Sequence, residues 1–393
     1  MKERPWNLQL ILISFVRLIL TTGLRMAYPF IPEISRGLSV SPETISRMIS
    51  FRALAGFFSP LFGPLSEIWG RKTLMLLGIL VFSLASLLVT LFPSIWTLGA
   101  ALFLIGLSKA IFDPPMQSYL GDRVPYKSRG WAVAVTEFSW SGSLLLGAPL
   151  VGLLIQKEGW SSPFLALSLG GFFVALLLFW GIPKIKTIGE EKDNHFLKTK
   201  KGSPIILFAG LFATLVLLAN ETLLIVFGVW MEGKFKLSIS GLGLTAGLIG
   251  GGELLGELSA GLAVDRFGKR RVILFFSGIT ALTYLLIPFL SKFLWSALLS
   301  LFFLFYAFET TIVAAIPLFT ELVPGARSVM MSASVASQSL GRALGALFGP
   351  TIFAWKGFGL SGIVASALMI LALLIFAFRI KEPPTSDWGF QKP

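Results

Sequence analysis

Long apolar runs dominate this chain, and short breaks with turn residues and charges separate them. A helix needs about 20 apolar residues to cross the hydrocarbon core of a membrane. With 55% hydrophobic and 13% charged residues, the chain has too little polar surface for a water-soluble domain. We therefore predict an all-α membrane protein with twelve transmembrane helices. The predicted spans are approximately residues 7–31, 43–66, 73–92, 94–120, 130–155, 161–182, 204–230, 238–263, 272–290, 293–320, 328–354 and 359–380.

The chain repeats itself across its longest polar break. The segment GPLSEIWGRKTLML begins at Gly63, and GLAVDRFGKRRVIL begins 198 residues later at Gly261. Such a repeat indicates two six-helix bundles of the same topology, related by an axis along the membrane normal. The predicted units are an N-terminal bundle (1–183), a cytoplasmic linker (184–203), a C-terminal bundle (204–382) and a cytoplasmic tail (383–393).

Basic residues predict the orientation. With the N-terminus inside, the inner segments hold 21 Lys and Arg and the outer loops hold 6. Cytoplasmic loops carry the excess of such residues, so both termini are expected in the cytoplasm of a cell with this chain in its inner (plasma) membrane. The same distribution accounts for the net charge of +13 without a nucleic-acid partner.

The chain lacks the residue types that several kinds of chemistry require. The chain has no cysteine and one histidine, His195 in the linker, which excludes disulfides, thiolate chemistry and a histidine-based metal centre. It has no phosphate-binding loop of the G-x-x-x-x-G-K-[ST] type. We therefore expect no enzyme, no catalytic residues, no metal and no cofactor, and we expect energy to come from an ion gradient or from exchange.

The loop between the second and third spans resembles that of major facilitator superfamily transporters. The family pattern G-x-L-a-D-R-x-G-R-K appears from Gly63 to Lys72, with Glu67 and Ile68 as departures. The resemblance covers essentially the whole chain and implies the fold of the major facilitator superfamily. It also implies a latch between the bundles, for which the alternative is a role in topology only. The latch candidates are Gly63, Glu67, Gly70, Arg71, Lys72, Asp265, Arg266 and Gly268.

The end of the first span resembles a second signature of this superfamily, that of the drug–proton antiporters. Gly23, Pro29 and Pro32 match its spacing, and Pro29 should bend or end the helix because it lacks a backbone donor. Many multidrug members carry an acid at the position that Arg25 occupies here. The departure disfavours a cation-selective mechanism, and Arg25 is expected to be a site for an anion or a counter-ion rather than a proton carrier.

Twelve ionisable residues lie within the spans. Basic residues prevail among those of the first half and acidic residues among those of the second. In the resembled family, spans one, four, seven and ten line the central cavity, and here all four carry charges. Either these groups bind substrate or charges of opposite halves pair in one state. The substrate-binding candidates are Arg17, Arg25, Lys109, Asp113, Glu221 and Glu309.

Two pairs of charged residues are each spaced four residues apart on one helix, one pair of opposite charge and one of like charge. Lys109 and Asp113 are four residues apart and can pair on one helix face. Glu253 and Glu257 have the same spacing and repel, so one of them is expected to hold a proton. The alternative is that water in a crevice solvates both. The proton-coupling candidates are Glu137, Glu253, Glu257 and Glu309.

The leading hypothesis is a secondary active transporter that works by alternating access. It would exchange protons for amphipathic organic molecules, anionic or zwitterionic ones among them, and export them. The alternatives are an importer or exchanger of an anionic metabolite, a lipid or glycolipid flippase, and a non-transporting membrane receptor. The expected partners are a small-molecule substrate, protons and the lipid bilayer, and the expected state is a monomer.

Overall fold

The computed structural model describes residues 5–125, 129–183, 204–323 and 327–381, which are helical apart from short connections. The first half comprises α1 (Trp6–Arg25), α2 (Ala27–Leu38), α3 (Pro42–Ala53), η1 (Leu54–Phe58), α4 (Ser59–Trp69), α5 (Arg71–Leu91), α6 (Ile95–Arg123), α7 (Arg129–Gly142), η3 (Ser143–Gly147), α8 (Ala148–Glu158) and α9 (Ser162–Gly181). The second half comprises α10 (Pro204–Leu224), α11 (Phe227–Phe235), α12 (Ile239–Phe267), α13 (Lys269–Leu290), α14 (Leu294–Leu322) and α15 (Arg327–Arg379). The predicted linker and the predicted tail lie outside the described residues.

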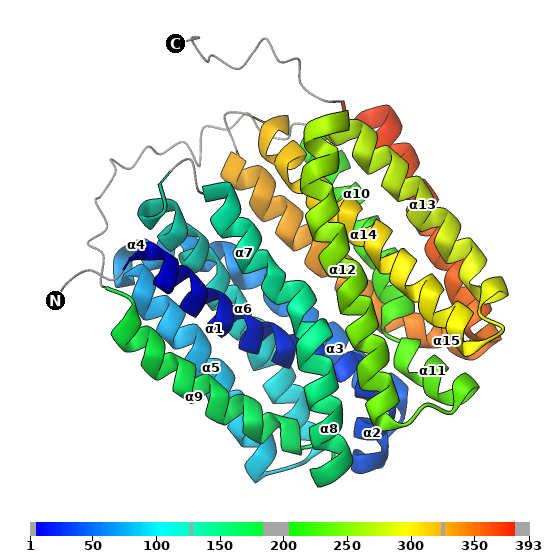
Figure 1. The fold of residues 1–393 in the computed structure, drawn as a ribbon, viewed down its shortest axis with the longest axis horizontal. Helices are drawn as coiled ribbons and strands as arrows, with labels where there is room; N and C mark the ends of the chain where they lie inside the picture. Colours follow the sequence, from blue (N-terminus) through cyan, green and yellow to red (C-terminus); the bar gives the residue numbers. More distant parts are fainter. Residues whose placement is uncertain (1–4, 126–128, 184–203, 324–326, 382–393) are drawn as a thin grey trace.

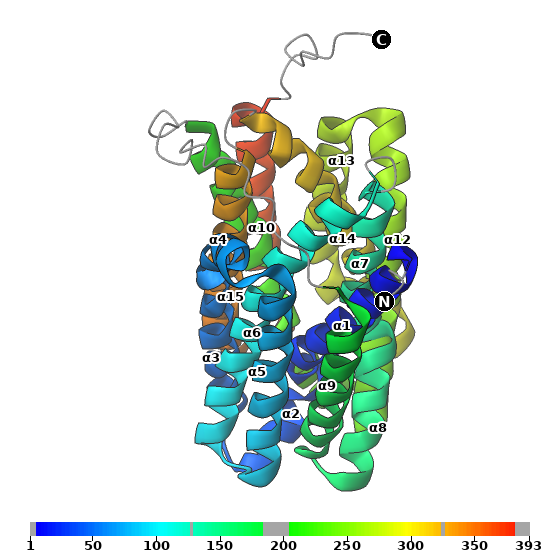
Figure 2. The ribbon, with the colours of Figure 1, turned by 90° about the vertical axis from the view of Figure 1, so that its left-hand side faces the viewer.

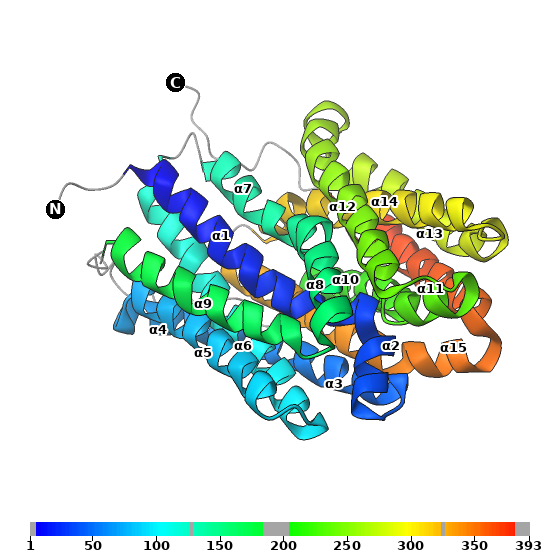
Figure 3. The same ribbon diagram turned by 60° about the horizontal axis from the view of Figure 1, so that its bottom comes forward.

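The described helices account for twelve membrane crossings. Eleven helical stretches are long and apolar enough to span a membrane, and the last of them, Met330–Arg379, makes up nearly all of the 53-residue α15. Lys356 and Gly357 leave helical geometry inside α15, and the chain turns back there. Figure 3 shows the two arms of α15, from orange to red. The last two predicted spans are these two arms, so the prediction of twelve spans is confirmed.

The first span is broken earlier than the sequence predicted. The bend falls at Met26, between α1 and α2, and Pro29 lies in the first turn of α2. The reason is that a proline affects the turn before it: Pro29 has no N–H to donate to the carbonyl of Arg25, and its ring crowds that carbonyl. The second half has a break at the equivalent place, between α10 and α11, without a proline.

The two halves are packed together at one end and diverge toward the other. We call the end at which α1 begins and α15 finishes the terminal end, and the opposite end the far end. In Figure 1 the helices of the two halves meet near α2, α8 and α11. At the other end, α4 of the first half lies far from the α12–α13 junction of the second half. Figure 2 shows the same halves from the side, with α5, α8 and α9 low and α10, α13 and α14 high.

Close backbone contacts seal the far end. Figure 3 shows α2 beside α11, where a Cβ on Gly228 would lie 2.6 Å from the carbonyl oxygen of Pro29. Gly250 of α12 lies similarly close to the backbone of η3. Ser50 of α3 donates a hydrogen bond to the carbonyl of Ala343 of α15, at 2.7 Å. The structure is therefore closed at the far end, with its halves apart at the terminal end.

Candidate functional site

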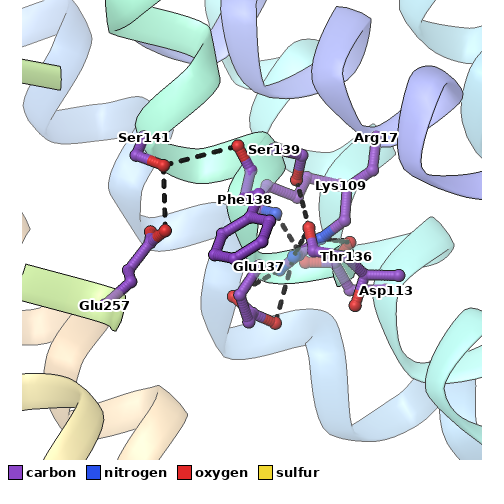
Figure 4. A network of polar contacts seen from close by, with 9 residues as sticks. All are labelled: Arg17, Lys109, Asp113, Thr136, Glu137, Phe138, Ser139, Ser141 and Glu257. Carbon is purple, nitrogen blue, oxygen red and sulfur yellow. Dashed lines mark hydrogen bonds and ion pairs between the residues drawn. The ribbon is translucent and has the colours of Figure 1, made fainter. Parts of the chain in front are cut away.

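The first half contains a cluster of four charged side chains from three helices. Arg17 of α1 forms ion pairs with Asp113 of α6, at 3.4 Å, and with Glu137 of α7, at 3.0 Å. It also donates a 2.6 Å hydrogen bond to the carbonyl of Thr136. Lys109 pairs with Asp113 at 2.6 Å, which confirms the pairing predicted from their spacing. We call these four charged residues the first-half cluster (Figure 4).

The first-half cluster is neutral in sum and borders the space between the halves. It holds two cations and two anions in mutual contact, which is what charges within a membrane require. The Arg17 side chain is 6% exposed, whereas that of Glu137 is 33% exposed. Figure 4 shows Glu137 on the side of the cluster that faces Glu257 of α12. Water or a ligand entering from the terminal end can therefore reach Glu137 before Arg17.

A buried ion pair joins the two halves. Arg25, the last residue of α1, donates two parallel hydrogen bonds to the carboxylate of Glu253 of α12, at 2.6 and 2.7 Å. The two side chains are 3% and 1% exposed. Arg25 also donates to the carbonyl of Trp140 and lies 4.2 Å from the centre of its ring. Of the two predicted roles for Arg25, the structure shows that of a counter-ion.

A second link between the halves runs through a tyrosine. Tyr28 of α2 donates a 2.5 Å hydrogen bond to Glu221 of α10, and Arg52 of α3 donates to the Tyr28 hydroxyl at 2.8 Å. Arg52 also donates to the carbonyl of Leu24. Glu221 is thus held with Tyr28 and Arg52. One of its oxygens, Oε2, is buried without a hydrogen-bond partner among the described residues.

Two further carboxylates of the second half have no basic partner among the described contacts. Glu257 accepts a 2.9 Å hydrogen bond from Ser141 of α7 (Figure 4). The other carboxylate oxygen of Glu257 is buried and has no hydrogen-bond partner in the described structure. Glu309 of α14 is 6% exposed and has no ion pair in the part of the chain that the structure describes. Its Cβ would lie 2.9 Å from a Cβ on Gly256, so it faces α12 beside Glu257.

Several residues of this region escaped the sequence-based selection of site residues. Tyr28 and Trp140 belong to no charge pattern or family motif quoted above, and their roles come from packing. Arg52 was counted among the charges of the spans but not selected. The same holds for Arg342. Its guanidinium lies 4.8 Å from the centre of the Trp140 ring, so Trp140 contacts both Arg342 and Arg25.

The candidate latch loops are built alike in the two halves. Gly70 and Gly268 each turn the chain between two helices with φ near +85°, at 88° and 82°, a conformation that only glycine adopts readily. Arg71 donates to the carbonyl of Ser118 at 2.6 Å and forms an ion pair with Asp122. The latter contact joins the loop to the end of α6, within the first half.

The second half repeats that contact at equivalent positions. Lys269 forms an ion pair with Glu321 at the end of α14. Two candidates, Asp265 and Arg266, lie exposed at the end of α12, as Glu67 does at the end of α4. Gly63 lies one turn earlier in α4, and Lys72 donates to the carbonyl of Phe179 in its own half. A latch between the bundles stays a prediction, because the halves diverge at this end.

The predicted site residues therefore fall into separate groups. Arg17, Lys109, Asp113 and Glu137 come together, whereas Glu253 binds Arg25 and Glu221 binds Tyr28. Glu309 lies against Gly256 of α12, the residue before Glu257. Among the described residues, no group of three His, Cys, Asp or Glu side chains is arranged to hold a metal ion.

The comparisons with known proteins identify the family. The model of the major facilitator superfamily matches residues 13–218 and 209–392, so the chain belongs to this superfamily. It is 23% identical over 370 residues to the uncharacterised superfamily transporter YceJ of Bacillus subtilis (strain 168), covering 92% of this chain and 93% of that one. It is 24% identical over 391 residues to the multi-drug resistance efflux pump PmrA homolog of Lactococcus lactis subsp. lactis (strain IL1403), covering 96% of each.

A solved structure shows the same fold. The crystal structure of a D-xylose–proton symporter matches with a TM-score of 0.80 at 16% identity, over 96% of this chain and 99% of that chain. The protein is therefore a multi-pass membrane transporter of the major facilitator superfamily and not an enzyme.

Proposed function

We propose that the protein exports amphipathic organic molecules in exchange for protons, by alternating access, with both termini in the cytoplasm of a cell that carries it in its inner membrane. The observation that carries this proposal is the buried Arg25–Glu253 pair, which holds the halves together at the closed end. Beside it lie Glu257 and Glu309, two carboxylates without a basic partner among the described residues.

The ion pair couples protonation to opening. The far end can open only if Arg25 separates from Glu253, and separating two buried charges costs several kcal/mol. A proton on Glu253 removes one of the charges, so the opening no longer leaves an isolated carboxylate. The structure, with the pair formed and the terminal end open, corresponds in this scheme to the state that has released its proton to the cytoplasm.

The distribution of charge also bears on the substrate class. The cations Arg17, Lys109 and Arg25 are each in contact with a carboxylate, so an anionic substrate would have to displace one. Glu257 and Glu309 are instead open to a proton or to the basic group of a substrate. Competition between the two for the same carboxylates gives antiport. The sequence alone favoured anionic or zwitterionic substrates because of Arg25, but Arg25 is occupied by Glu253. We therefore favour basic or zwitterionic amphiphiles, with Arg342 and Trp140 as contacts for a zwitterion's acidic group.

The direction of transport has support from a relative. The Lactococcus lactis protein to which this chain is similar over nearly its full length carries the name of an efflux pump. One proton moving down 100 mV supplies about 2.3 kcal/mol, which sustains roughly a 50-fold gradient of a neutral molecule. That driving force suffices for export of a zwitterion, which carries no net charge, whereas exchange of one proton for one monovalent base moves no net charge and draws on the pH gradient alone.

Proteoliposomes with an imposed pH gradient test the proposal. We expect a basic amphiphilic dye to be transported against the proton flux and the transport to stop when the gradient is collapsed. The variant Glu257→Gln should flatten the pH dependence of transport, because one competing carboxylate is gone. Ser141→Ala, which removes only the hydrogen bond to Glu257, is the matched control and should keep that dependence. Transport that continues after every ion gradient has been collapsed would contradict proton coupling.

A further inference from the structure

A pocket of about 440 Å³ opens at the far end of the second half, away from the site between the halves. It lies where α11, the end of α13 and the bend of α15 meet. Its wall contains a stack in which the rings of Trp230 and Phe358 are parallel, 3.7 Å apart at 2°. Val229, Pro288 and Phe353 add further apolar surface. The pocket therefore suits a hydrocarbon chain.

Exposed aromatic side chains place this pocket at the boundary of the membrane. Trp295 and Trp355 lie within a few residues of pocket-lining residues in the sequence, and their exposed fractions are 82% and 74%. Phe293 is 73% exposed. Trp side chains gather at the level of lipid headgroups, where one part of the ring is wet and the rest is in hydrocarbon. A pocket at this level is within reach of the lipids of the leaflet on the far side.

The mouth of the pocket is basic. Lys234 lines it, and the Lys234 ammonium donates to the carbonyl of Ser291, which places Lys292 next to it. Lys356 precedes the lining residue Gly357, and all three lysines are exposed. The only acid of the described segments 225–239, 286–297 and 351–362 is Glu232, which forms an ion pair with Arg36 of the other half.

We propose that this pocket binds an anionic glycerophospholipid. The phosphate would lie among Lys234, Lys292 and Lys356, and an acyl chain would enter between Val229, Pro288 and Phe353. A lysine near a lipid surface contributes about 1 kcal/mol toward an anionic headgroup, which is about fivefold in affinity. The same end of the first half has no comparable excess, since its described segments hold two basic residues, Arg36 and Lys157, and three acidic ones, Glu33, Glu43 and Glu158.

Native mass spectrometry of the purified full chain tests this site. Phosphatidylglycerol and phosphatidylcholine with identical acyl chains are titrated in detergent, and soluble glycerol 3-phosphate is added in a separate arm. We expect wild-type protein to prefer phosphatidylglycerol by about fivefold or more and glycerol 3-phosphate not to compete. The triple variant Lys234→Gln/Lys292→Gln/Lys356→Gln should lose the preference, whereas Lys157→Gln should keep it.

A second variant fills the pocket itself. A Cβ on Gly233, which lines the pocket, would meet no atom within 4 Å, so Gly233→Leu should occupy the cavity without a clash and weaken phosphatidylglycerol binding about tenfold. Gly278→Leu is the matched control on α13, where a Cβ also meets nothing within 4 Å. Equal binding of both lipids by the wild type, or unchanged binding by the lysine variant, overturns the proposal. The exposed lysine substitutions leave the fold intact, so this outcome is decisive even if Gly233→Leu fails to fold.

Discussion

The two halves share one fold but treat buried charge in different ways. In the first half, Arg17 and Lys109 are neutralised by Asp113 and Glu137 of the same half. Among the described residues, Glu253 of the second half is neutralised only by Arg25 of the first half. Glu257 and Glu309 of the second half have no basic partner among the described residues.

This difference assigns different tasks to the halves. A cluster that is neutral by itself keeps its energy whether the halves are together or apart, so the first-half cluster adds no electrostatic cost to their separation. The charge balance of the second half changes with the contact between the halves or with a proton. The Arg25–Glu253 pair and the carboxylates Glu257 and Glu309 are therefore the places where the electrostatic energy can depend on the conformation of the transporter, whereas the first-half cluster is not.

The largest expected effect comes from breaking the pair that joins the halves. Arg25→Ala leaves the Glu253 carboxylate buried and uncompensated, which should destabilise the protein by about 3–5 kcal/mol. Transport should fall by more than tenfold, because the closed far end loses its bridge. Thermal unfolding in detergent and transport in proteoliposomes measure the two effects.

The double variant Arg25→Ala/Glu253→Ala provides the control. It removes both charges, so much of the lost stability should return, while transport stays impaired. A double variant as unstable as the sum of the two single variants would show that the pair itself does not couple the halves.

A smaller effect is expected within the first-half cluster. Arg17→Met leaves Asp113 paired with Lys109 and leaves Glu137 in contact with solvent, so the expected loss is about 1–3 kcal/mol. Because Arg17 and Arg25 share no hydrogen-bond partner in the described structure, the losses in Arg17→Met/Arg25→Ala should add. Denaturant unfolding of the two single variants and the double variant measures this. A coupling larger than about 0.5 kcal/mol would mean that the two networks are one.

What the sequence could predict depends on how local each feature is. The apolar runs and the repeat around Gly63 and Gly261 are properties of single helices and single loops, so the sequence predicts them. The Lys109–Asp113 pair lies within about one turn of one helix and was predictable for the same reason. Arg25 and Glu253 are 228 residues apart, so their contact depends on how the halves are packed in one conformation. The bend at Met26 was within reach, because a proline disturbs the residue four positions earlier.

The smallest expected effect concerns an exposed pair between the same halves. Arg36 of α2 donates hydrogen bonds to Glu232 of α11 and to Glu33 of its own helix. These hydrogen bonds raise the pKa of Arg36 above its usual value. Arg36 therefore stays charged at every practical pH, and salt is the better probe. The Arg36 side chain is 53% exposed, so Arg36→Gln should cost at most about 1 kcal/mol at low salt and less at 1 M salt, where charges are screened within about 3 Å. Thermal unfolding at the two salt concentrations measures it. An effect as large as that of Arg25→Ala would show that contact between the halves, rather than burial of the charges, decides the cost.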